Sequence, residues 1–308
     1  MTRLCRMLAL LALCAITLMP AACENDKPLP PEMKVSNDDV TLYARIAGNP
    51  GSGKVLVAIS GGPGLSSDYM LSLEQLASPD LAVVTYDPRG TGRSTTPADD
   101  TANYHLDKYV ADLEAVRQAV RAERVHLLGH SWGGLVAMYY ATVHPERVNS
   151  MVLVGSGPPS ARTLTAGQFR LQDRIGELAA QDLIPRELPQ NDAESAQAIL
   201  PAYFHDPSFE PPAEIIGTRF SPTAYQRTLS ALGQYDLTAD VAGLGHQILV
   251  LWGEGDPFDM EVGEATRDAL SAARVEFVVL EECGHFWQEC PDEFYPLVRD
   301  FLGLPIEP

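Results

Sequence analysis

The chain has 308 residues, 45% of them hydrophobic, and a formal net charge of −19 at pH 7. This length suits one large α/β domain with an insertion. Such an acidic chain would repel phosphate groups, so we expect no nucleic-acid partner. The sequence contains no dinucleotide-binding fingerprint, phosphate-binding loop or metal-ligand cluster. We therefore expect neither a cofactor nor a metal.

Residues 1–22 are typical of a signal peptide. Arg3 and Arg6 precede an apolar run over 7–19, and small residues lead up to Cys23. The run is shorter than the ~20 residues that span a membrane. We expect an exported protein. It is either a soluble periplasmic product of ordinary cleavage or a lipoprotein attached to the membrane, since Cys23 resembles a lipidated cysteine.

Proline-rich residues 23–34 predict a stiff tether. Beyond the tether, apolar runs alternate with stretches of helical periodicity. The expected strands are a hairpin of 34–35 and 40–46, then 55–59, 81–86, 124–128, 148–154, 247–253 and 275–280, and the expected helices include 106–122 and 165–183. Wholly apolar strands require cover on both faces, so the pattern predicts a mostly parallel sheet between two layers of helices.

One stretch passes from a strand into a helix through Gly129-His130-Ser131-Trp132-Gly133. Gly-x-Ser-x-Gly in that context predicts a tight turn that presents the serine at the edge of the sheet. The helix N-terminus behind it offers N–H groups to a developing oxyanion. Ser131 is the predicted nucleophile. The alternative is a glycine-rich turn of a nucleotide-binding sheet.

Seven histidines compete for the role of general base. His285 follows the apolar strand 275–280, and so lies at the carboxyl end of a strand, where open α/β sheets place their sites. For the acid, Asp256 follows strand 247–253 and fits the order Ser, Asp, His. Its neighbours Glu254 and Asp259 are alternatives. The predicted catalytic triad is Ser131, Asp256 and His285.

Three segments together resemble the proline iminopeptidases, the S33-type serine peptidases among the α/β-hydrolases. They are residues 61–69 (GGPGLSSDY), 87–94 (DPRGTGRS) and 129–134 (GHSWGG). The resemblance implies an α/β-hydrolase core of eight strands over 35–157 and 237–308, and an inserted helical cap over 158–236. It differs at Ser60, where the family's HGGPG motif has His.

The glycine-rich segment 61–64 has a predicted role in acyl transfer, which needs two donors near the carbonyl oxygen. One donor is the N–H of Trp132, directly after the nucleophile. The resemblance implies that the other is the N–H of Gly62. The alternative for this segment is an ordinary surface turn.

Two cysteines of the mature chain, Cys283 and Cys290, flank His285. In an oxidising periplasm they would form a disulfide that braces this loop. The alternative is a pair of small buried hydrophobic side chains.

The resemblance implies an aminopeptidase that releases N-terminal proline or another apolar residue from short peptides through an acyl-enzyme. Tyr203 and Phe204 are the expected substrate-binding residues, although packing of cap against core explains such aromatics equally well. The family's cap glutamate stands shortly before this pair, where the chain has Leu200. Four glutamates of the cap are candidates for its role, with solvated helix or loop charges as the alternative: Glu177, Glu194, Glu210 and Glu214.

Other functions remain open at this stage. A carboxylesterase or amidase of the same fold would use the same triad, and its substrate would be a small ester or amide instead of a peptide. A non-catalytic binding protein is disfavoured by the complete triad.

Overall fold

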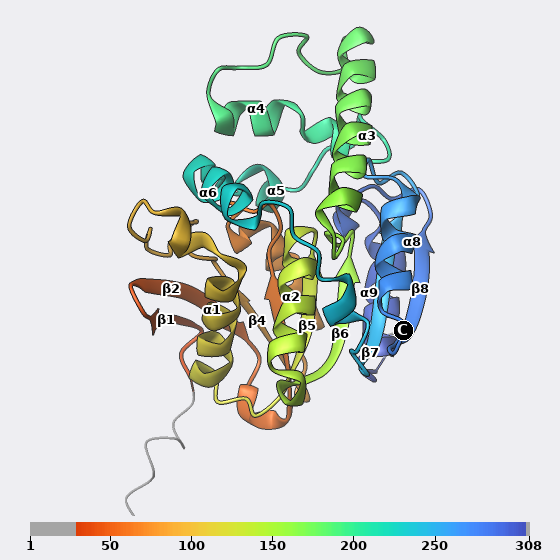
Figure 1. The fold of residues 1–308 in the computed structure, drawn as a ribbon. Coiled ribbons are helices and arrows are strands. Elements are labelled where there is room, and N and C mark those ends of the chain that lie inside the picture. Colours follow the sequence, from red (N-terminus) through yellow and green to blue (C-terminus); the bar gives the residue numbers. More distant parts are fainter. Residues whose placement is uncertain (1–28, 306–308) are drawn as a thin grey trace, which may run out of the picture.

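The computed structural model describes residues 29–305, and its centre is an eight-stranded sheet with the order β1-β2-β4-β3-β5-β6-β7-β8. The strands are β1 (Glu32–Asn37), β2 (Val40–Ala47), β3 (Lys54–Ile59), β4 (Leu81–Tyr86), β5 (Val125–His130), β6 (Val148–Val154), β7 (Gln247–Gly253) and β8 (Arg274–Leu280). β2 pairs antiparallel with β1 and β4, and every other pairing is parallel. The predicted mostly parallel sheet of eight strands is confirmed (Figure 1).

The central strands are apolar throughout because both faces of the sheet are covered. In β3, Val55, Val57 and Ile59 enter one core, and Leu56 and Ala58 enter the other, which is the alternation of a strand. The first core is completed by α1 (Leu106–Ala119), α2 (Trp132–Val143), α7 (Thr238–Val241) and α8 (Met260–Ala269), and the second by the 3₁₀ segment η3 (Ser67–Leu76) and α9 (Pro291–Phe301).

Short 3₁₀ segments complete the connections: η2 (Pro50–Ser52), η4 (Thr101–Tyr104), η5 (Pro145–Arg147) and η7 (Trp287–Glu289). In the part of the chain that the structure describes, no helix is both long and apolar enough to cross a membrane.

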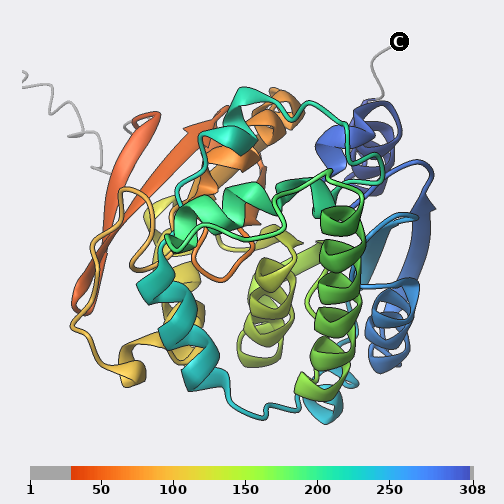
Figure 2. The ribbon, with the colours of Figure 1, turned by 90° about the horizontal axis from the view of Figure 1, so that it is seen from above.

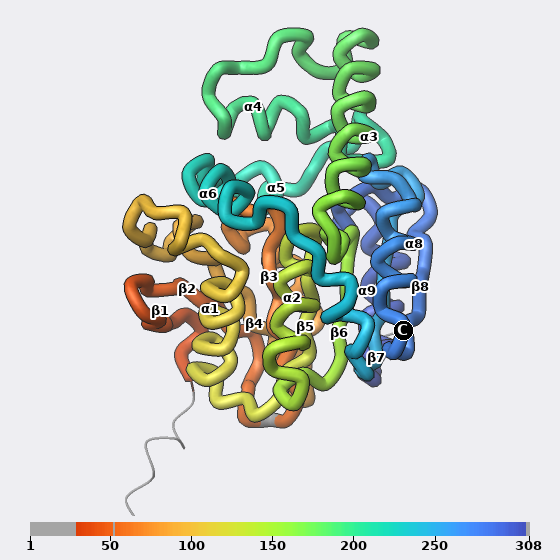
Figure 3. Tube along the Cα trace, viewed as in Figure 1, coloured from red at the N-terminus to blue at the C-terminus, as the bar shows by residue number. Residues whose placement is uncertain are grey.

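A run of helices between β6 and β7 forms the cap, the insertion expected over 158–236. It contains α3 (Ala161–Ala180), α4 (Asp192–Ala198), η6 (Leu200–Tyr203), α5 (Ala213–Ile216) and α6 (Pro222–Leu232). In Figures 1 and 3 these elements lie above the sheet, and Figure 2 shows them crossing over it. α3 begins at 161, earlier than the expected 165, because the Ser160 side chain accepts the Thr163 N–H and caps the helix.

The cap is fastened to the loop that follows β3. Leu65 and Phe220 form an antiparallel bridge, and the Ser66 N–H donates to the Arg219 carbonyl at 2.9 Å. The Arg219 guanidinium also contacts Asp68 at 3.1 Å. The glycine-rich loop expected to provide an oxyanion donor is thus directly linked to the cap.

At the N-terminal side, β1 starts at Glu32, inside the segment expected to be a tether. Its pairing with β2 begins there, with Glu32 opposite Arg45 and a 3.2 Å ion pair between their side chains. The predicted leader, residues 1–22, and Cys23 lie outside the described residues, so export and lipidation stay predictions.

Candidate active site

Ser131 sits at the junction of β5 and α2 in a backbone conformation that non-glycine residues rarely adopt, with φ 54° and ψ −123°. The turn is compact because glycines replace larger residues around it. A Cβ on Gly133 would collide with the Ile59 carbonyl, and one on Gly134 would collide with Ser156. These contacts hold the start of α2 against the sheet, and Ser131 lies directly before the first helical residue, Trp132.

His285 and Asp256 meet at the ends of β8 and β7. Their Nδ1 and Oδ2 atoms lie 2.7 Å apart, and both residues are nearly inaccessible to solvent. The other carboxylate oxygen of Asp256 accepts the Phe258 N–H at 2.9 Å. A carboxylate only accepts, so Nδ1 of His285 carries a hydrogen, and in the neutral imidazole the lone pair is then on Nε2. That is the form a general base requires.

The two alternative acids have other partners. Asp259 caps α8 through the Glu261 N–H and pairs with Arg170 at 3.2 Å. Glu254 accepts the Glu282 N–H at 3.3 Å. Of these three carboxylates, Asp256 is the one that bonds to His285.

The nucleophile candidate and this pair lie side by side. The Ser131 N–H donates to the Val154 carbonyl at 2.9 Å, and the next residue, Gly155, is so close to the pair that an added Cβ would lie 2.9 Å from His285 Nδ1 and 3.0 Å from Asp256 Oδ2. Among the described residues no hydrogen bond joins Ser131 to His285. Such bonds are often long in unliganded sites and tighten when substrate binds.

The two expected oxyanion donors face the same cavity as Ser131. Gly62 and Trp132 both line it, and neither N–H is donated to an acceptor within residues 29–305. Gly62 has φ +114°, a conformation that favours glycine. The adjacent Gly61 N–H is occupied, since it donates to the Tyr69 hydroxyl at 2.6 Å. Two free donors beside a serine suit a developing oxyanion.

His130 joins three parts of this site, and sequence reasoning did not assign it a role. Its Nε2 lies 2.9 Å from the His285 carbonyl oxygen, and its Nδ1 lies 2.8 Å from the Tyr69 hydroxyl. Because a carbonyl only accepts, Nε2 of His130 donates, and Nδ1 accepts from Tyr69. Burial lowers the pKa of His130 well below its usual value, so the ring is neutral. The partners are far apart in sequence, and no local pattern predicts them.

A disulfide closes the loop that carries His285. Cys283 and Cys290 are bonded, with their Cα atoms 5.5 Å apart. The structure therefore has the predicted disulfide and not the alternative, a pair of unbonded hydrophobic side chains.

Glu289, inside the same loop, connects it to the cap. One carboxylate oxygen accepts the N–H groups of Gly284 at 2.7 Å and His205 at 2.8 Å, and the other accepts that of Asp206 at 2.8 Å. The His285 N–H also donates to a cap carbonyl, that of Tyr203, at 2.7 Å. The cap therefore contacts the histidine loop as well as the glycine-rich loop.

A cavity of about 560 Å³ lies between the core and the cap and reaches Ser131. Tyr203, one of the two expected substrate-binding residues, lines it. Phe204 does not: its side chain is 1% exposed and packs against Phe209 and Phe286. Adjacent residues here point to different surroundings, so the expected substrate contact of Phe204 has no support in the structure.

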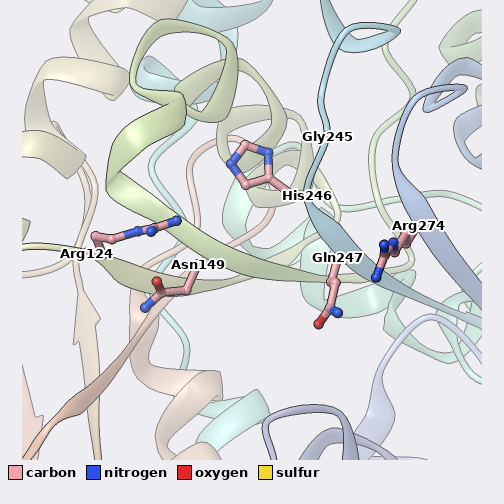
Figure 4. A pocket seen from close by; sticks show the side chains of 6 residues that line it. All are labelled: Arg124, Asn149, Gly245, His246, Gln247 and Arg274. Atoms are coloured by element: carbon pink, nitrogen blue, oxygen red, sulfur yellow. The ribbon is translucent and has the colours of Figure 1, made fainter.

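A second cavity, of about 490 Å³, lies at the opposite edge of the sheet, where the parallel strands begin. It is lined by Arg124, Asn149, Gly245, His246, Gln247 and Arg274. Figure 4 shows the two arginines on either side of His246. It contains none of the predicted catalytic residues. Within 29–305, no group of acidic, histidine or cysteine side chains is arranged to hold a metal ion.

Comparison with known proteins gives one family and a consistent set of relatives. Residues 54–289 match the model of a family described as alpha/beta hydrolase fold. A proline iminopeptidase from Heyndrickxia coagulans is 29% identical over 272 residues, which cover 82% of this chain and 92% of the relative. One from Lactobacillus helveticus is 26% identical over 289 residues, covering 84% and 93%.

Solved structures show the same fold. A proline iminopeptidase from Mycobacterium smegmatis superposes with a TM-score of 0.66 at 23% identity, covering 88% of this chain and 97% of that chain. A proline iminopeptidase-related protein from Thermus thermophilus has a TM-score of 0.70 at 24% identity, covering 90% and 98%.

Proposed function

This chain belongs to the α/β hydrolase fold family and is a hydrolase, and we propose that it cleaves ester, amide or peptide bonds through an acyl-enzyme on Ser131. The observation that carries the proposal is the 2.7 Å hydrogen bond from His285 Nδ1 to Asp256. This bond leaves Nε2 as a base at the edge of the sheet where the serine stands.

In the proposed reaction, Ser131 Oγ attacks the substrate carbonyl and His285 Nε2 takes the hydroxyl proton. Asp256 holds the ring and stabilises the imidazolium that forms. The N–H groups of Gly62 and Trp132 bind the oxyanion. The imidazolium then gives its proton to the leaving amine or alcohol. A water molecule repeats the cycle on the acyl-enzyme, and the carboxylic acid is released.

Two substrate classes have support. The similarity to proteins named proline iminopeptidase supports an aminopeptidase that releases N-terminal proline or another apolar residue from short peptides. An uncharged ester or amide is supported by the cavity, whose lining residues are neutral.

The serine mechanism is tested with a fluorophosphonate, which labels an activated serine. We expect wild type to be labelled and Ser131→Ala to resist labelling while its circular dichroism and thermal unfolding stay unchanged. Full labelling of the variant would exclude Ser131 as the nucleophile.

We further propose that the protein is exported. Support comes from the basic and apolar N-terminal segment and from a disulfide in the body of the chain, a bond that persists in oxidising compartments. Mass spectrometry of mature protein from a bacterial envelope should find an N-terminus at Cys23 or just after the leader, and an intact residue 1 would refute export. Loss of hydrophobic partitioning in Cys23→Ser would support the lipid anchor.

A further inference from the structure

We infer that the cavity beside Ser131 takes an uncharged acyl group and excludes substrates with a free α-ammonium beside the scissile bond. This inference rests on the proposed serine hydrolase function and chooses between its two substrate classes.

The wall of the cavity carries no charged side chain. Its 24 described lining residues include no Asp, Glu, Lys, Arg or His. Tyr203, Tyr225 and Tyr235 are its most acidic groups, and burial raises the pKa of each of them. They therefore stay protonated near neutral pH, and the cavity presents only neutral groups to a substrate.

An aminopeptidase needs a different wall. Its substrate has an ammonium group one carbon away from the reacting carbonyl, and so this charge enters the cavity with the acyl group. Removing an ammonium from water without a partner is strongly unfavourable, and an opposing carboxylate is the usual compensation.

Several carboxylates near the catalytic residues are already engaged. Asp256 bonds to His285 and the Phe258 N–H. Asp259 pairs with Arg170, and Glu289 accepts three backbone N–H groups. None of these carboxylates lines the cavity.

The cap glutamates do not supply the charge either. Glu177, Glu187, Glu194 and Glu210 are exposed to solvent, Glu214 is half-buried, and none of the five lines the cavity. Leu200, in the cap segment that leads to Tyr203, packs with the second hydrophobic core and brings no charge.

The same wall suits neutral groups. Leu164, Leu171, Leu229, Leu232 and Val262 offer apolar surface to an alkyl or aryl chain. The side-chain amides of Gln168 and Gln172 offer neutral hydrogen bonds. The hydroxyl groups of Ser156 and Thr165 donate to backbone carbonyls and can only accept from a substrate. A volume of about 560 Å³ lies within the usual range for small-molecule sites, about 300–1,000 Å³. The matching substrates are esters and N-blocked amides with a bulky apolar acyl group.

The direct test compares three substrates on wild type at pH 7: an alanine arylamide with a free amine, its N-acetyl form, and an aryl ester of an apolar acid. We expect kcat/KM for the N-acetyl form to exceed that for the free amine about tenfold or more, because an unpaired ammonium must be desolvated. We expect the ester to be the fastest of the three. Equal rates for the two amides, or a faster free amine, would overturn the inference.

The outcome is separated from failure of the hydrolase function by labelling Ser131 with a fluorophosphonate in the same preparation. Labelling together with a preference for the free amine refutes the uncharged cavity and leaves the serine hydrolase standing. Absence of both labelling and turnover would refute the proposed function and, with it, this inference.

A charge placed in the wall sharpens the test. Gln168→Glu keeps the shape of a half-buried lining side chain. We expect it to raise the free-amine to N-acetyl ratio of kcat/KM about threefold or more, which is within the energy of a partly exposed ion pair. Glu177→Gln, on the exposed surface of the same helix α3, is the matched control and should leave the ratio unchanged. An unchanged ratio in Gln168→Glu would contradict the placement of the acyl group in this cavity.

Discussion

Two cavities formed by residues 29–305 lie at opposite edges of one sheet and have similar volumes, about 490 and 560 Å³. The cavity at the amino edge includes Arg124 and Arg274 and no predicted catalytic residue. The cavity at the carboxyl edge is uncharged and includes Ser131. Charge alone would direct attention to the first cavity, although it is the smaller of the two. The position of a cavity relative to the strand ends is the better guide to chemistry.

The reason lies in the topology of a parallel sheet. β5, β7 and β8 run in the same direction, so the loops that follow them leave from one edge. Those loops carry Ser131, Asp256 and His285, residues far apart in the sequence. The opposite edge receives only the segments that enter the strands.

The largest expected effect comes from removing the nucleophile at the carboxyl edge. Ser131→Ala should lower kcat by about a thousandfold or more at unchanged stability. The matched control is Ser156→Ala, which removes a second serine hydroxyl from the same cavity wall. It should keep kcat within about tenfold of wild type. A comparable loss in both variants would mean that the wall, and not the nucleophile, was disturbed.

His130 provides the next largest effect. His130→Gln keeps an acceptor and a donor, but its flexible amide does not hold them at the positions of the two ring nitrogens that bond the Tyr69 hydroxyl and the His285 carbonyl, so both neighbouring loops should shift. Small displacements of catalytic groups lower rates strongly, and we expect kcat to fall about 10- to 100-fold with KM nearly constant.

Two readouts separate positioning by His130 from mere destabilisation. Since His130 is neutral, it does not titrate near neutral pH. The kcat of His130→Gln should therefore rise and fall with pH at the same pH values as that of wild type. Tyr69→Phe removes the bonds of the Tyr69 hydroxyl to Gly61 and His130 but leaves the bond from His130 to the His285 carbonyl, so it should lose less activity than His130→Gln. A large rise in KM with unchanged kcat would contradict positioning.

The disulfide tests how far the histidine loop depends on covalent closure. Replacing Cys283 and Cys290 together by Ser should lower the free energy of unfolding by about 2 kcal/mol, the chain-entropy value for so short a loop. Denaturant titration measures this, and kcat should fall only severalfold, because Glu289 and the Tyr203 carbonyl still hold the loop. A loss of kcat as large as that of Ser131→Ala would show that the bridge dominates.

The smallest effects on activity belong to the amino edge. There, burial together with Lys54 and Arg124 lowers the pKa of His126 to about 4. Its ordinary value applies in the unfolded chain, which therefore binds more protons between about pH 6.5 and 4. The free energy of unfolding should fall as the pH decreases through this window. In urea titrations, the free energy of unfolding of His126→Asn should differ less between pH 7 and pH 5 than that of wild type. A part of the difference should remain, because burial also lowers the pKa of His130.

Arg124→Gln removes one of the positive charges near His126. It should raise the pKa of His126 slightly, as followed by NMR titration, and leave kcat unchanged. A drop in kcat would show that the two edges of the sheet communicate.

Features encoded in contiguous residues could be predicted from the sequence. The strands follow from apolar runs, and the nucleophile follows from Gly-x-Ser-x-Gly between a strand and a helix. His130 could not be predicted, because it bonds to His285, 155 positions away. The burial of Phe204 could not be predicted either, because adjacent residues have different surroundings here: Tyr203 lines the cavity and Phe204 packs in the core. The cap elements α4, η6 and α5 have only 7, 4 and 4 residues, too few for a helical period to show in the sequence.

The way the cap is attached limits how freely it can be exchanged between enzymes. Phe220 pairs with Leu65 beside the glycine-rich loop, and His205 and Tyr203 bond to the loop of His285. A cap transplanted from another enzyme would therefore replace the contacts with both catalytic loops as well as the walls of the pocket. Chimaeras that keep the native residues at these junctions should change substrate preference alone, whereas exchange of the entire insertion should also lower the turnover of every substrate. Divergence of specificity on this scaffold is expected to proceed through the cavity-facing sides of α3 and α6, where substitutions leave the junctions intact.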